Sequence, residues 1–101
     1  MSILITAATS APAHRLKIKL NNDAVWLGDY LELPKFMLAV GNMLTLPNPH
    51  SSAYTHEMLT LCLDKGIDTV YLIRPEEAGI LLKADQLFKE YNIILIKVDE
   101  I

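Results

Sequence analysis

The sequence predicts an α/β protein with a three-layer, doubly wound, mostly parallel five-stranded sheet of the Rossmann-like type. Two patterns carry this prediction. Short runs of β-branched and aliphatic residues alternate with longer segments in which apolar residues recur at the helical period. The runs are apolar at nearly every position, which is typical of parallel strands covered by helices on both faces. With 101 residues, the chain has the size of one domain with one core.

Five apolar runs are the predicted strands, and turn-forming residues follow several of them. Gly28 and Asp29 follow the second run, and Pro47 closes the third. Apolar residues dominate each run, so each strand is expected to be buried on both faces. The predicted strands cover residues 2–8, 24–27, 43–46, 69–73 and 93–98.

Between the second and fourth strands, two segments carry helix start and stop signals. Residues 34–40 begin with a proline and precede a Gly-Asn pair, which predicts a short helix. Residues 51–65 predict a longer helix, with Ser51 or Ser52 as its N-cap. Gly66 follows directly and is expected to close this helix in the left-handed conformation.

Residues 11–20 fit two structures. Pro12 suits the first turn of a helix in which Ala13 and Leu16 share one face. Residues 15–20 also alternate strictly between polar and apolar, and the Asn-Asn-Asp sequence at 21–23 is typical of a hairpin turn. Periodicity leaves the helix and the hairpin arm both open.

The last helical segment, residues 76–91, has an unusually wide apolar surface. Acidic residues in its first turn favour the helix dipole. A helix that is apolar nearly all round is usually buried from two sides, and in so small a domain the second side is expected to be another subunit. We therefore predict a homodimer, or docking to a separate partner chain. The expected interface residues are Ile80, Leu82 and Leu87, and the expected inner face is Leu81, Ala84, Phe88 and Tyr91.

Composition narrows the possible functions. The net charge of −3 argues against a nucleic-acid partner, which requires a basic surface. No run approaches the ~20 apolar residues that a membrane span needs, and no signal peptide is recognisable. Cys62 is the single cysteine, so an intrachain disulfide is excluded, and its apolar surroundings predict a core position. A cytoplasmic location is expected.

In an open parallel sheet, ligands bind beyond the carboxyl ends of the strands, at the point where the strand order reverses. This rule selects residues that follow the predicted strands. The preferred ligand-binding candidates are Thr9, Ser10, Asp29, His50 and Arg74. The same rule also selects Thr6, Tyr30, Ser51 and Glu76.

Each candidate also has a purely structural interpretation. Thr9 and Ser10 would present a helix N-terminus to an anion, or merely cap that helix. Asp29 lies about 20 residues beyond that turn, where a ribose-binding acid is found in dinucleotide-binding units, or is a turn residue. Arg74 would clamp a carboxylate or phosphate, or pair with the neighbouring Glu76 or Glu77. The three histidines lack metal-ligand spacing, and no metal site or catalytic triad is expected.

The run TLPNPHSSAYTHEMLTLCLDKGIDTVYLIRPEE resembles the N-terminal, pre-ATP-grasp domain of ATP-grasp carboxylate–amine ligases. The opening ILITAATSAP and the closing FKEYNIILI are similar to the same family, in the group related to carbamoyl-phosphate synthetase. The resemblance favours the helix over the hairpin at residues 11–20. The matching positions are Pro47, Tyr54, Leu59, Leu61, Cys62, Gly66, Ile67, Asp68, Glu76, Glu77, Phe88, Ile93 and Ile94.

The departures from that family shape the functional expectation. Ala7, Ala8, Thr9 and Ser10 stand where the family usually has a glycine, and their Cβ atoms restrict close approach of a ligand. The segment at residues 21–33 is short for the family. The lysine, carboxylates and magnesium site of an ATP-grasp fold have no room in 101 residues, so catalytic residues are not expected here.

The resemblance therefore implies a detached pre-ATP-grasp domain that acts as a non-catalytic binding or assembly module. One alternative is the small subunit of a split ligase, in which ATP and magnesium bind only through a separate ATP-grasp chain. Another alternative is a nucleotide-binding regulator that uses Ser10 and Asp29.

Overall fold

The computed structural model describes residues 2–8, 10–20, 24–30, 35 and 43–98. Its centre is a five-stranded sheet in the order β3-β2-β1-β4-β5, and every described pairing is parallel. The predicted α/β class and parallel sheet are confirmed, with strand ends that differ from the prediction by at most three residues. The strands are β1 (Ser2–Ile5), β2 (Val25–Asp29), β3 (Met43–Thr45), β4 (Ile67–Leu72) and β5 (Ile94–Lys97).

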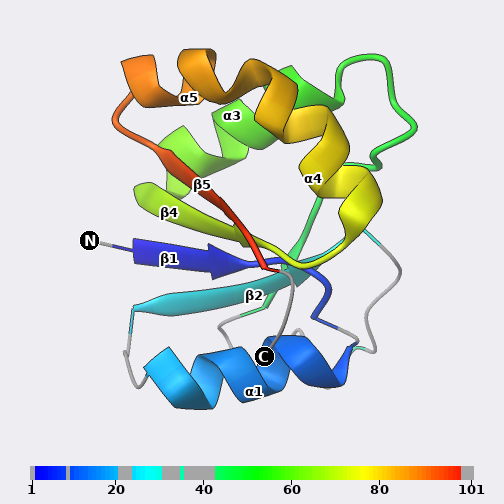
Figure 1. Cartoon of the computed structure of the whole chain (residues 1–101), viewed down its shortest axis with the longest axis vertical. Helices are drawn as coiled ribbons and strands as arrows, with labels where there is room; N and C mark the ends of the chain where they lie inside the picture. The colour runs from blue at the N-terminus through cyan, green and yellow to red at the C-terminus, as the bar shows by residue number, and fades with distance from the viewer. Residues whose placement is uncertain (1, 9, 21–23, 31–34, 36–42, 99–101) are drawn as a thin grey trace.

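Helices cover both faces of this sheet, which gives the three layers (Figure 1). Helix α1 (Ala11–Leu20) lies against one face, where Ile5, Leu16 and Leu27 belong to one buried cluster. The other face carries a larger cluster with α3 and the C-terminal helices. These are α3 (Tyr54–Lys65), α4 (Pro75–Leu81), the 3-10 turn η1 (Leu82–Ala84) and α5 (Asp85–Glu90).

The segment that fitted two structures is a helix. Residues 11–20 form α1, and Ala13 and Leu16 are its buried residues. Tertiary packing decides between the two periods, because these two side chains fill the space over β1 and β2. The predicted helix at residues 34–40 and the predicted turn at 21–23 lie outside the described residues, apart from Lys35, which is helical.

The serine cap predicted for the helix after β3 is wrong. Helix α3 begins at Tyr54, and its N-cap residue is Ala53, which has no side-chain cap. The Ser51 hydroxyl instead donates a hydrogen bond to Glu57 Oε1 at 2.9 Å and accepts one from the Ala53 N–H at 3.2 Å. The C-terminal prediction is confirmed: Gly66 has φ 67° and closes α3 in the left-handed conformation.

The single helix predicted over residues 76–91 is interrupted by η1, so this prediction is also corrected. Leu81 and Phe88 face the core as expected, and Ala84 is half-buried. Tyr91 does not join this inner face, because it follows the end of α5, where the chain turns through Asn92 at φ 61°. The Tyr91 side chain is therefore 49% exposed.

Gly28 in β2 permits close contact with Leu46, and its substitution is predicted to destabilise the protein. An added Cβ would lie 2.7 Å from Leu46 Cδ2 and 2.8 Å from Cγ. Leu46 is buried, so it has little room to move. Gly28→Ala is expected to lower the free energy of unfolding, measured by urea denaturation, by about 1 to 3 kcal/mol.

Gly79→Ala is the matched control for this prediction. A Cβ at Gly79 meets no atom within 4 Å, and the residue lies inside α4. The same substitution there should raise the free energy of unfolding by about 0.5 to 1 kcal/mol, because alanine favours the helix. Equal effects at the two glycines would contradict the close contact at Gly28.

Candidate functional site

The strand order reverses between β1 and β4, and the carboxyl ends of these neighbouring strands define the switch point. Thr6, which directly follows β1, joins the two strands there. Its hydroxyl donates to the Tyr71 carbonyl at 3.3 Å and accepts from the Ile73 N–H at 3.1 Å. We call the buried and half-buried polar residues around this point the switch-point cluster. Its members are Thr6, Asp29, Tyr54, Arg74 and Glu77.

Asp29 and Arg74, both predicted ligand-binding residues, bind each other. Arg74 Nη2 donates to Asp29 Oδ2 at 2.8 Å and to Oδ1 at 3.1 Å. The Asp29 side chain is fully buried, whereas the Arg74 side chain is 21% exposed. The sequence alternative, in which Arg74 pairs with Glu76 or Glu77, is wrong. The ion pair instead links the end of β2 to the start of α4 across β1.

The ion pair with Asp29 and the ring of Tyr30 both stabilise the charge of Arg74. Burial alone would lower the pKa of this guanidinium, but the hydrogen bond and the negative charge of Asp29 raise it above its usual value. The Tyr30 ring also lies 5.1 Å from the Arg74 guanidinium carbon, a cation–π distance. Arg74 is therefore a permanent cation held by Asp29 and Tyr30.

Glu77 is a buried carboxyl group at the same place. Its side chain is fully buried, and neither carboxyl oxygen has a hydrogen-bond partner. Burial raises the pKa of Glu77 to about 7, although the nearby Thr6 hydroxyl and Arg74 act to lower it. The Thr6 hydroxyl makes its hydrogen bonds with Tyr71 and Ile73, and the Glu77 oxygens stay unbonded. Glu77 therefore changes its protonation near neutral pH.

Tyr54, the first residue of α3, contributes a second buried polar group. Its side chain is 1% exposed, and its hydroxyl has no hydrogen-bond partner. Burial, followed by the charge of Glu77, raises the pKa of the Tyr54 phenol far above its usual value. Tyr54 is therefore neutral at any physiological pH, and it does not act as a base.

Of the remaining predicted ligand-binding residues, Ser10 and His50 do not join this cluster. Ser10 donates its hydroxyl hydrogen to the Ala7 carbonyl at 2.7 Å, which closes the turn before α1. His50 is exposed in the connection between β3 and α3, where its N–H bonds Asn48 Oδ1 at 2.8 Å. Thr9 lies outside the described residues. The cluster thus retains only Asp29 and Arg74 of the preferred candidates.

The predicted interface residues are half-buried. Ile80, Leu82 and Leu87 pack against the larger core cluster and keep part of their surface exposed.

Cys62 is a core residue, as predicted, and burial raises the pKa of its thiol to about 12. Such a thiol is protonated and is not a nucleophile.

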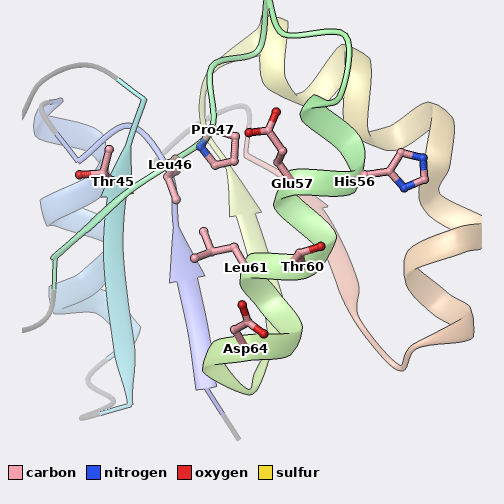
Figure 2. Close-up of a pocket in the computed structure, with 8 residues that line it drawn as sticks. All are labelled: Thr45, Leu46, Pro47, His56, Glu57, Thr60, Leu61 and Asp64. Carbon is pink, nitrogen blue, oxygen red and sulfur yellow. The ribbon is translucent and has the colours of Figure 1, made fainter.

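A separate open groove of about 520 Å³ lies between the end of β3 and one side of α3 (Figure 2). We call it the β3–α3 groove. In Figure 2, Leu61 and Asp64 extend from α3 toward the segment that carries Leu46 and Pro47, whereas the His56 ring extends to the other side of the helix. The lining residues are Thr45, Leu46, Pro47, His56, Glu57, Thr60, Leu61 and Asp64.

Sequence reasoning missed Glu77 as a buried group, although a signal was present. Glu77 precedes Leu81 by four residues and Phe88 by eleven, so all three fall on one helical face. The acidic first turn predicts a favourable interaction with the helix dipole or an ion pair with Arg74, and neither interpretation requires a buried carboxyl group. The groove was missed as well. Its two walls come from the end of β3 and from α3, and only the packing of α3 on the sheet determines how far apart these two segments lie.

The fold and the site together describe a doubly wound α/β domain with a buried charge cluster at its switch point. No family model matches the chain, and a search of curated proteins finds no significant match. Within the described residues, no group of three or more His, Cys, Asp or Glu side chains is placed to hold a metal ion. No helix in that part of the chain is long and apolar enough to cross a membrane.

Proposed function

We propose that this chain is a non-catalytic binding or assembly module, of the kind that a detached pre-ATP-grasp domain would be. The observation that carries the proposal is the ion pair between Asp29 and Arg74. In a nucleotide-binding domain, an acid at this place would bind a ribose and an arginine would bind a phosphate. Here the two groups bind each other, with Arg74 Nη2 2.8 Å from Asp29 Oδ2, and this pairing competes with binding of a ribose or a phosphate.

The buried carboxyl of Glu77 supports the same proposal. Above pH 7 it adds negative charge beside the neutral pair of Asp29 and Arg74, which disfavours a phosphate at the switch point. ATP, AMP and NAD are therefore expected to leave the melting temperature unchanged in a thermal-shift assay. A clear rise with any of them would instead favour the nucleotide-binding regulator.

Assembly is proposed to use the outer surface of α4, η1 and α5. The half-buried residues Ile80, Leu82 and Leu87 lie on this layer, and Tyr91 adds an exposed aromatic ring at its end. The partner is proposed to be a second copy of the chain. A separate ATP-grasp chain, which would supply ATP and magnesium, is the alternative and should then co-purify with this protein.

Leu82→Glu is predicted to shift the protein from dimer to monomer in sedimentation-velocity centrifugation. A charge at this half-buried position opposes burial against a second copy. Ile18→Glu is the matched control, because Ile18 is 78% exposed on α1, on the opposite face of the sheet. The control should remain dimeric. A wild-type monomer with no co-purifying chain would refute the assembly proposal.

A further inference from the structure

The β3–α3 groove combines an apolar floor with negative charge at both ends of one wall. Leu46, Pro47 and Leu61 supply the apolar surface. Glu57 and Asp64 supply the charge, and no lysine or arginine is among the described lining residues. The groove volume of about 520 Å³ lies in the range typical of small-molecule sites. These features favour a small cationic ligand with an apolar body.

The two carboxylates are arranged in a line. Glu57 and Asp64 are seven residues apart on α3, so they lie on the same side of the helix, separated by about 10 Å along its axis. This separation is too large for one metal ion, whose oxygen ligands must all lie within about 2.6 Å of it. A linear molecule with a positive charge near each end matches the spacing.

Glu57 is held in place before any ligand arrives. The Ser51 hydroxyl donates a hydrogen bond to its Oε1 at 2.9 Å. This contact restricts the carboxylate, and a restricted carboxylate loses less side-chain entropy when it binds a cation. Ser51 was predicted to cap α3. It instead positions the Glu57 carboxylate at the groove.

We propose that the β3–α3 groove binds an aliphatic polyamine, a linear chain with an ammonium group near each end. The ammonium groups pair with the carboxylates of Glu57 and Asp64. The methylene segment between them lies over Leu46, Pro47 and Leu61. This site is distinct from the switch-point cluster and does not depend on the assembly surface of α4 and α5.

Isothermal titration calorimetry with spermidine, at constant ionic strength, tests the proposal. Spermidine should bind at one site, and 1,3-diaminopropane, which is too short to reach both carboxylates, should bind at least tenfold more weakly. Glu57→Gln and Asp64→Asn should each weaken spermidine binding about threefold, as expected for exposed ion pairs. The double variant should weaken it about tenfold.

Glu90→Gln is the matched control, because it removes an exposed negative charge from α5, outside the groove. It should bind spermidine like the wild type, and circular dichroism should show that all variants are folded. Equal binding by the wild type and the double variant would overturn the proposal, as would no spermidine binding. Tighter binding of an oligolysine peptide than of spermidine would also overturn it, in favour of a protein partner.

Discussion

Arg74→Ala is expected to lower the free energy of unfolding by about 3 kcal/mol. The alanine leaves the fully buried carboxylate of Asp29 without its cation. Removal of one partner from a buried ion pair typically costs about 3 to 5 kcal/mol, because the remaining charge stays desolvated. We expect the lower end of this range for Arg74→Ala. The Arg74 side chain is 21% exposed, so water already reaches part of the ion pair. Urea denaturation at pH 7 measures the change.

A second substitution distinguishes the loss of the ion pair from the loss of packing. Asp29→Asn in the Arg74→Ala background removes the buried negative charge that has lost the Arg74 cation, so it should recover part of the lost stability. Asp29→Asn alone should destabilise, because it removes the carboxylate that Arg74 binds through two hydrogen bonds. If the double variant is no more stable than Arg74→Ala, the contribution of Arg74 lies in its contacts with Tyr30 rather than in the ion pair.

Glu77→Gln is expected to stabilise the protein at and above neutral pH. Burial raises the pKa of Glu77 from its usual 4.5 to about 7, so the folded state holds this proton more tightly than the unfolded state. The unfolding free energy of the wild type should therefore fall as the pH rises from about 4.5 to about 7, and level off above that. The shift corresponds to about 3 kcal/mol.

The glutamine variant should lack this decrease. Its side chain resembles the protonated acid in shape and remains neutral at every pH, so its stability should exceed that of the wild type at pH 8 and match it at pH 4. Thermal denaturation between pH 4 and pH 8 measures both curves. Within the part of the chain that the structure describes, the charged and titratable groups that act on Glu77 are Asp29 from β2, Tyr54 from α3, and Arg74 and Glu76 at the start of α4.

Glu76→Gln is the matched control for this titration. Glu76 is the exposed neighbour of Glu77 in the same turn, so its substitution removes the same charge without removing a buried carboxyl. It should leave the pH dependence of stability in place. An unchanged pH dependence in Glu77→Gln would show that Glu77 is charged and accommodated in the fold, in contradiction to its burial without a hydrogen-bond partner.

The predictions for Ile80, Leu82 and Leu87 illustrate one limit of periodicity. The apolar surplus of residues 76–91 indicated a helix with two buried sides. In the structure, the 3-10 turn at Leu82–Ala84 interrupts the helix, and the three residues use part of their surface against the core. A periodicity argument assumes a regular α-helix, so it does not predict the 3-10 turn between α4 and α5.

The sequence by itself determined the α/β class, five parallel strands, the closure of α3 at Gly66 and the core position of Cys62. Each of these follows from local composition, since buried parallel strands are apolar throughout and a left-handed helix end favours glycine. The switch-point cluster was decided only by the tertiary structure. Asp29 and Arg74 are 45 residues apart in the chain. They meet because the strand order places β2 and β4 on either side of β1, so two predicted ligand-binding residues form one ion pair.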